Sequence, residues 1–97
     1  ADCATFEDAR AANAFGAEIL ATTLCGYTAE TRGNTLPALA LVARIAELKA
    51  FTICEGGIGS PEEGRSALLA GADAVVVGTA LTGIPARVGE FAAALTK

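Results

Sequence analysis

The sequence contains no histidine, no methionine and no tryptophan among its 97 residues. Without histidine, the chain lacks the commonest metal ligand and the commonest general base. Three cysteines, Cys3, Cys25 and Cys54, form no CxxC pair, so the sequence predicts neither a zinc site nor a disulfide framework. We expect these thiols to be reduced and buried, as in a cytoplasmic protein.

Positive charge and long apolar runs are also scarce. The chain has 7 basic and 11 acidic residues, a net charge of −4, and no basic patch with interleaved aromatic residues. This composition argues against a nucleic-acid partner. No apolar run approaches the ~20 residues of a membrane span. No basic leader precedes an apolar stretch, so we expect neither a membrane anchor nor a signal peptide.

The N-terminus lacks a methionine as well. A chain that begins Ala1-Asp2-Cys3 does not begin where translation begins, so we expect it to be processed or to be a piece of a longer protein. Its length and its apolar fraction of 53% otherwise suit one small domain over residues 1–97.

What the sequence does contain is an internal repeat with an offset of 55 residues. Residues 5–10 resemble residues 60–65, and residues 16–18 resemble residues 71–73. Each copy predicts a helix that begins after a hydroxyl N-cap and ends at a glycine. A short apolar run follows each copy and is typical of a parallel strand covered on both faces.

Further units complete the pattern. Apolar residues recur at helical spacing between Leu36 and Leu48, and a closing helix is expected from Pro85 to Leu95. Strands are expected at four places, residues 1–3, 19–23, 51–54 and 74–77, the first being a truncated strand end. This alternation predicts a parallel α/β fold with right-handed crossovers.

Candidate site residues follow the strands, because ligands of parallel α/β folds bind at the carboxyl ends of the strands. Glu55 directly follows an apolar strand, where it could perform general acid–base catalysis or could only bond loop N–H groups. Asp2 ends the first strand and could equally cap a helix. Tyr27 could be a lid residue or a packing residue. Arg32, in the long loop, is the best candidate for a charged substrate contact.

Glycine-rich turns follow the last two strands. Gly56-Gly57-Ile58-Gly59 leads into a capped helix, and Gly78-Thr79 ends the next strand. Glycines let backbone N–H groups approach an anion, and a helix N-terminus adds a positive dipole. Barrel enzymes commonly bind phosphate after strands 7 and 8, so these turns are predicted to bind phosphate. The alternative is that the glycines only form tight turns.

Four segments, in this order, resemble the N-acetylmannosamine-6-phosphate 2-epimerase family: residues 1–5, 22–28, 55–63 and 76–82. The resemblance spans the whole chain and is most specific in residues 22–28 and at the Glu55-Gly56 pair. It implies that residues 1–97 are a single domain, the C-terminal half of a TIM (β/α)8 barrel with strand–helix units 5 to 8.

The resemblance also implies an isomerase activity. The family interconverts N-acetylmannosamine-6-phosphate and N-acetylglucosamine-6-phosphate by removing and returning the proton at C2, in sialic acid and amino sugar catabolism. It uses no metal and no organic cofactor. Asp2 matches the family's sugar-contacting Asp, and Glu55 matches its active-site Glu, which orients the sugar or shuttles protons. Gly78 and Thr79 match its phosphate-binding turn.

Tyr27 and Arg32 match the loop that follows the sixth strand of the family's barrel. At three other points the chain departs from the family. Gly57 stands where members often carry Lys or another polar residue, and Gly83 stands where they often carry an Arg on phosphate. The family's catalytic Lys lies in the first half of the barrel. Neither Lys49 nor Lys97 can take that role, so we expect the isolated chain to be inactive.

Two alternatives remain beside this interpretation. The chain could belong to another phosphate-binding barrel enzyme. It could also be a non-catalytic half barrel that associates with itself, because half a barrel exposes two sheet edges and an apolar inner face. A homodimer, or complementation by an N-terminal half barrel, would cover both the edges and the face.

Overall fold

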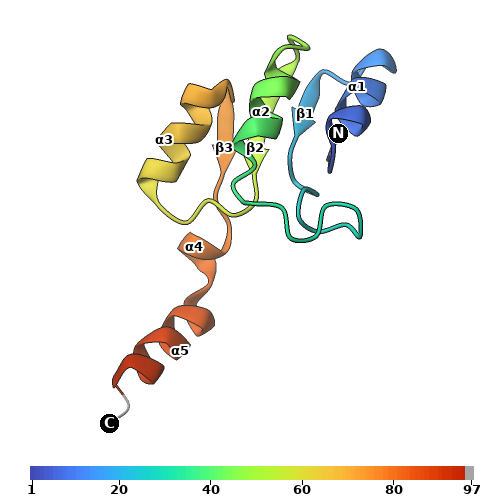
Figure 1. The fold of residues 1–97 in the computed structure, drawn as a ribbon. Coiled ribbons are helices and arrows are strands. Elements are labelled where there is room, and N and C mark those ends of the chain that lie inside the picture. The colour runs from blue at the N-terminus through green and yellow to red at the C-terminus, as the bar shows by residue number, and fades with distance from the viewer. Residues whose placement is uncertain (96–97) are drawn as a thin grey trace.

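A computed structural model describes residues 1–95 of the protein. Three parallel strands form its central sheet (Figure 1). The sheet order is β1-β2-β3, with β1 at Ile19–Ala21, β2 at Phe51–Glu55 and β3 at Ala74–Val76. Asp2 forms an isolated parallel bridge to Ala21, so residues 1–3 continue the sheet beside β1. The predicted parallel α/β pattern is confirmed.

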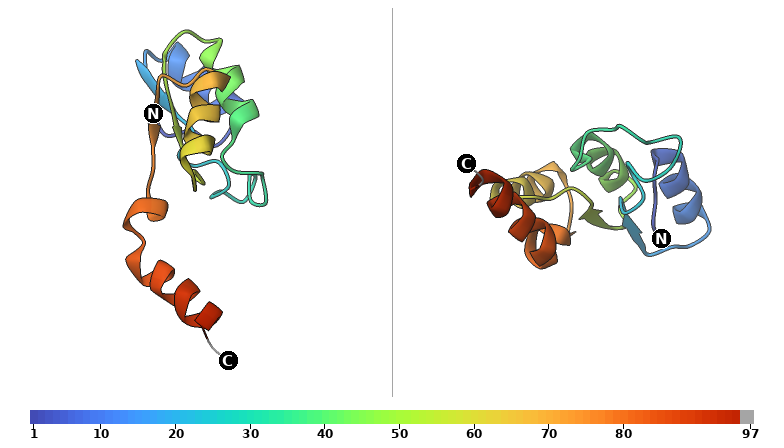
Figure 2. Two further views of the ribbon diagram at one scale, coloured as in Figure 1. Left: turned by 90° about the vertical axis from the view of Figure 1, so that its left-hand side faces the viewer. Right: turned by 90° about the horizontal axis from the view of Figure 1, so that it is seen from below.

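Three helices cover one face of this sheet (Figure 2). They are α1 at Phe6–Ala14, α2 at Leu39–Ala46 and α3 at Pro61–Ala70. Side chains alternate along β2, where Thr52 and Cys54 are buried under the helices and Phe51 is exposed. Within residues 1–95, no helix covers the opposite face.

Both predicted hydroxyl caps are present. The Thr5 hydroxyl accepts a hydrogen bond from the Asp8 N–H, and the Asp8 carboxylate accepts one from the Thr5 N–H, each at 3.2 Å. The Ser60 hydroxyl accepts from the Glu63 N–H at 3.2 Å, and Pro61 occupies the first helical position. The repeated sequence therefore begins two equivalent helices.

Helix α2 begins later than the periodicity predicts, at Leu39 instead of near Leu36. Pro37 accounts for the difference, because a residue before proline is disfavoured in the helical region. Strand β1 is also shorter than expected and ends at Ala21, so Thr22 and Thr23 lie just beyond it. The Thr22 N–H still donates to the Ile53 carbonyl at 3.1 Å.

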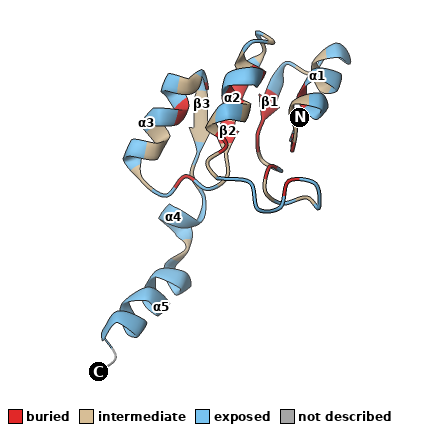
Figure 3. Cartoon of the chain, in the orientation of Figure 1, coloured by how far each residue is buried: buried red, intermediate tan, exposed pale blue. Residues whose placement is uncertain are grey.

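The C-terminal part of the chain leaves the sheet through a short helix, α4 at Thr79–Thr82, and continues as α5 at Ile84–Leu95. Helix α5 forms as predicted, but it does not close the layer. Its apolar stripe of Ile84, Val88, Phe91 and Leu95 is 60% to 75% exposed (Figure 3). The radius of gyration is accordingly 15.0 Å, against about 12.5 Å for a compact domain of this length.

The core contains two clusters of buried residues, each with one cysteine. Cys54 packs with Val42 and Ala67 between β2, α2 and α3, and Cys3 packs with Leu20 in the other cluster. Cys25 is buried too, and all three thiols are free, as the sequence predicts. Burial raises the pKa of the Cys3 and Cys54 thiols above its ordinary value.

The turn after β2 requires glycine at two successive positions, where φ is 108° at Gly56 and 75° at Gly57. A Cβ on Gly57 would overlap the Leu36 side chain. The loop before α2 therefore lies directly against this turn. This approach excludes at position 57 the larger side chains that the resemblance leads one to expect there.

Substitution Gly57→Ala should lower the free energy of unfolding by about 2–5 kcal/mol. A left-handed backbone costs an L side chain ~1–2 kcal/mol, and forced overlap in a packed region adds ~1–3 kcal/mol. Gly33→Ala is the matched control, since Gly33 has φ of 88° and open space around its Cβ position. Urea unfolding measures both variants. Equal losses would contradict the contact with Leu36.

The native chain at about pH 8 should react with Ellman's reagent far more slowly than the urea-unfolded chain. Burial keeps the reagent away from Cys3, Cys25 and Cys54, and the raised pKa of Cys3 and Cys54 lowers their thiolate fraction. The absorbance of released thionitrobenzoate measures the rate. Rapid reaction of any thiol before unfolding would contradict the buried core.

Candidate functional site

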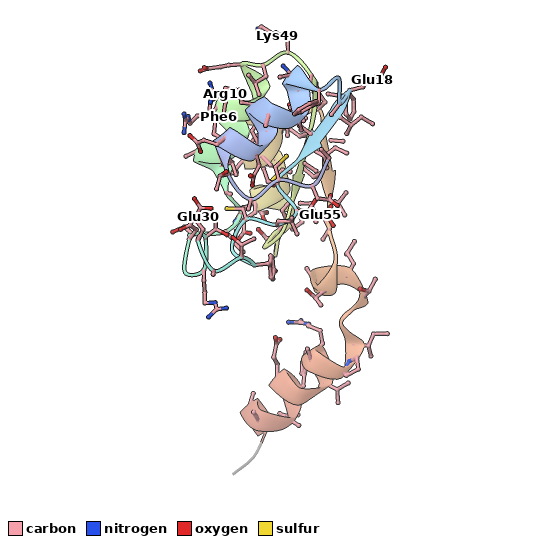
Figure 4. All side chains as sticks on the ribbon, turned by 90° about the vertical axis from the view of Figure 1, so that its right-hand side faces the viewer. Phe6, Arg10, Glu18, Glu30, Lys49 and Glu55 are labelled. Atoms are coloured by element: carbon pink, nitrogen blue, oxygen red, sulfur yellow. The ribbon has the colours of Figure 1, made fainter. Side chains whose placement is uncertain are left out.

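A pocket of about 310 Å³ opens at the carboxyl end of the sheet. It brings together residues that follow all three strands, and its lining consists of Thr23, Tyr27, Glu55, Gly56, Gly57, Ile58, Val76, Gly78 and Thr79. Six of the predicted site residues are therefore in one pocket. Glu55 lies at this end of the sheet, while Lys49 and Glu18 lie at the opposite end of the sheet (Figure 4).

The backbone of Glu55 is held by the hydroxyl of Thr22, which is fully buried. Thr22 Oγ1 donates to the Glu55 carbonyl oxygen at 3.0 Å and accepts from the Glu55 N–H at 3.1 Å. One side chain thus satisfies both backbone groups of Glu55 and joins the ends of β1 and β2. The sequence pattern does not predict this role, although Thr22 belongs to residues 22–28, where the family resemblance is most specific.

The two predicted carboxyl groups meet at the next hydroxyl along the chain. Thr23 Oγ1 lies 2.8 Å from Asp2 Oδ1 and 3.0 Å from Glu55 Oε2. Asp2 is exposed and does not line the pocket, but Thr23 connects it to Glu55, which is half-buried. The structure therefore places Asp2, Thr23 and Glu55 side by side at the ends of neighbouring strands.

The long loop after β1 carries the other two predicted contacts. The Thr28 and Thr31 hydroxyl oxygens lie 2.6 Å apart, and the Gly26 N–H donates to Thr31 Oγ1 at 2.9 Å, so the loop is fixed internally. Tyr27 is exposed at the rim of the pocket. Arg32 is exposed and is not among the lining residues, so the structure does not bring it to Glu55.

Unpaired backbone donors occur at the glycine turns. The N–H groups of Gly57 and Gly78 donate to no group within residues 1–95. The Gly59 N–H, in contrast, donates to Glu63 Oε2 at 3.0 Å, and Ser60 caps the helix that follows. An anion could therefore bind at Gly57 and Gly78 more readily than at the start of α3.

A guanidinium lies near these turns although position 83 is glycine. Gly57, Thr79, Gly83 and Arg87 are among the residues that line a second hollow, of about 650 Å³, between the turn and α5. The Arg87 guanidinium pairs with the Glu90 carboxylate at 2.7 Å. Both side chains are mostly exposed, so this pair contributes no more than ~1 kcal/mol to stability and Arg87 can exchange Glu90 for another anion.

Lys49, which the sequence placed at the wrong end of a strand, precedes β2 and has φ of 65°. Lys97 lies outside the described residues. Over residues 1–95, no cluster of three or more His, Cys, Asp or Glu side chains is arranged to hold a metal ion. Within the same range, no helix is long and apolar enough to cross a membrane.

Known proteins have similar sequences. The family model described as "Putative N-acetylmannosamine-6-phosphate epimerase" matches residues 1–97. A Synechococcus elongatus protein named "Putative N-acetylmannosamine-6-phosphate 2-epimerase" is 47% identical over 97 residues, which are 98% of this chain and 42% of that protein. The bifunctional enzyme NanE/NanK of Brucella melitensis is 49% identical over 82 residues, which are 84% of this chain and 16% of that enzyme.

The fold is shared as well. The solved N-acetylmannosamine-6-phosphate 2-epimerase from Clostridium perfringens has a TM-score of 0.82 and 33% identity, covering 93% of this chain and 41% of that chain. The predicted fold class, a parallel α/β part of a TIM barrel, is thereby confirmed. This chain spans less than half the length of the relatives it matches. Because the family match covers every residue, the chain belongs to the N-acetylmannosamine-6-phosphate epimerase family.

Proposed function

We propose that this chain forms part of an enzyme that epimerises C2 of an N-acetylhexosamine 6-phosphate. The reaction interconverts N-acetylmannosamine-6-phosphate and N-acetylglucosamine-6-phosphate. The observation that carries the proposal is one pocket in which Glu55, linked through Thr23 to Asp2, lies beside glycine turns with unpaired N–H groups. Membership of the family supports the substrate class.

In this proposal Glu55 is the catalytic residue of the chain. Epimerisation removes the proton at C2 and returns a proton to the other face, so it needs groups that accept and donate protons at the sugar. Glu55 is the last residue of β2 and is held at its backbone by Thr22, which fixes the position from which its side chain extends. Asp2 binds the sugar from the neighbouring strand, and Tyr27 covers the rim.

The phosphate binds in this proposal to Gly56, Gly57, Gly78 and Thr79. Unpaired N–H groups next to glycines can approach an anion without a side chain in the way. These residues share the pocket with Glu55, so a bound sugar phosphate extends from the turns toward the carboxyl groups. A sugar contact by Arg32 remains a prediction from the sequence.

We further propose that the chain works as strand–helix units 5 to 8 of one barrel domain, completed by an N-terminal half barrel or by a second copy. Parallel sheets are normally covered on both faces. Here Ile19, Phe51 and Val76 are 41% to 48% exposed on the face without helices, and α5 exposes its apolar stripe. A covering half would bury this surface and could supply the lysine base.

Residues 1–97 alone should not convert N-acetylmannosamine-6-phosphate, whereas the complete gene product that carries them should. The reason is that no lysine among the described residues lies at the pocket end of the sheet. Proton NMR of the substrate and product signals measures conversion. Robust turnover by the isolated residues would contradict the missing base, and an inactive complete gene product would contradict the proposed reaction.

In the complete gene product, Glu55→Gln should lower kcat by about 100-fold or more while KM changes only a few-fold. Loss of a general acid or base typically costs 10²- to 10⁴-fold in rate, and a loss confined to the transition state appears in kcat. Glu62→Gln, on the exposed start of α3, is the control and should retain the parent rate. A change in KM alone would assign Glu55 to binding only.

The isolated chain should associate with itself in the absence of another half barrel. Sedimentation equilibrium, which reports mass independently of shape, should give twice the mass of one chain. Phe91→Asp places a charge in the apolar stripe of α5 and should weaken the association, whereas Ala93→Asp is the matched control outside that stripe. A well-behaved monomer of the parent chain would contradict self-association.

A further inference from the structure

The hydroxyl group of Thr23 lies within hydrogen-bond distance of two carboxyl groups, those of Asp2 and Glu55. Its hydroxyl oxygen lies 2.8 Å from Asp2 Oδ1 and 3.0 Å from Glu55 Oε2, both within hydrogen-bond distance. A hydroxyl group has a single proton, so it donates to only one carboxylate at a time. With both carboxylates ionised, the other contact sets an oxygen lone pair against a negative oxygen. Both contacts become hydrogen bonds when one carboxyl group carries a proton.

The carboxyl groups of Asp2 and Glu55 lie on either side of the Thr23 hydroxyl. Two carboxylates on either side of one oxygen atom repel each other, and a proton on one of them removes that repulsion. The lining of the pocket contains no lysine or arginine that could offset the second negative charge, and its other titratable group is Tyr27. The Ala1 ammonium donates to the Ile19 carbonyl at 2.7 Å.

Hydrogen bonds on both sides of Thr23 hold its backbone against the neighbouring strands. On one side of Thr23, Thr22 is bonded to both backbone groups of Glu55. On the other side, the Leu24 N–H donates to the carbonyl of Cys3, the residue after Asp2, at 3.2 Å. Thr23 is therefore tied to the two strands that carry its carboxyl partners, and its hydroxyl has little freedom to leave them.

We infer that Thr23 is a positioning residue that holds Asp2 and Glu55 on one shared proton and lets that proton pass between them. In the first arrangement, the protonated Glu55 donates to Thr23 Oγ1, and the Thr23 hydroxyl donates to the Asp2 carboxylate. When the Glu55 O–H bond breaks, Thr23 accepts that proton and gives its own to Asp2. Thr23 is again a hydroxyl, Asp2 is neutral, Glu55 is negative, and no other reactant is needed.

The catalytic consequence rests on the proposed function. After Glu55 has given a proton to the sugar or taken one from it, Asp2 restores its protonation state through Thr23. Glu55 can then act again without exchanging a proton with bulk water in the pocket. Thr23 itself does not touch the reacting carbon in this scheme; it acts through Glu55.

The test compares Thr23→Val, which keeps the shape but removes the hydroxyl, with Thr23→Ser, which keeps the hydroxyl. In the complete gene product, Thr23→Val should lower kcat by about tenfold to a hundredfold, the rate equivalent of a lost hydrogen bond to a charged group, with little change in KM. Thr23→Ser should restore most of the rate. Thr35→Val, in the exposed loop, is the control and should match the parent protein.

The pH profile separates this role from a packing role. Loss of the hydroxyl removes two hydrogen bonds from the singly protonated pair but only one from the doubly ionised pair. The protonated form is therefore destabilised more, and the high-pH limb of the kcat profile should move to lower pH in Thr23→Val. A parent-like rate and profile in Thr23→Val, equal damage in Thr23→Val and Thr23→Ser, or an effect on KM alone would each overturn the inference.

A readout without activity keeps the inference distinct from the proposed reaction. Carboxyl ¹³C NMR titration of Glu55 in the complete gene product should show its proton lost at lower pH in Thr23→Val than in the parent protein. This shift should appear even if the protein converts no sugar phosphate, which would defeat the reaction but not the shared proton. Superimposable titrations of the parent protein and Thr23→Val would overturn the inference whatever the activity.

Discussion

The parallel register between β1 and β2 is the constraint on which the rest of the structure depends. Ile19 pairs with Phe51 and Ala21 pairs with Ile53, so the residues just past β1 come level with Glu55 at the end of β2. A slip of one residue would turn every side chain to the other face of the sheet. The buried Thr22 hydroxyl is hydrogen-bonded to both backbone groups of Glu55 and so fixes the register at the end of β2, where the pocket opens.

The features that the sequence could predict are those that depend on local chemistry. The caps at Thr5 and Ser60, the strands between helices and the free, buried cysteines follow from short patterns of residues, and they are present. The positions of Asp2 and Glu55 at strand ends could be predicted for the same reason. The resemblance to one enzyme family depends on residues 22–28 and on the Glu55-Gly56 pair, which are also local patterns.

The rest depends on contacts between segments distant in the sequence, which periodicity does not encode. The role of Thr23 requires a register that joins residues 32 positions apart. The start of α2 depends on Pro37, and the glycine at position 57 depends on the approach of Leu36. The pattern of α5 identifies an apolar stripe but not the surface that covers it, so the helix was predicted and its packing was not.

The detached position of α5 has a hydrodynamic consequence. The molecule measures 55 × 28 × 19 Å along its principal axes, so it is about twice as long as it is wide. An elongated particle diffuses more slowly than a sphere of equal mass, because its frictional coefficient is larger. A single chain would therefore elute early on gel filtration, at the position of a heavier globular standard. An early peak would therefore not by itself distinguish one elongated chain from two associated chains.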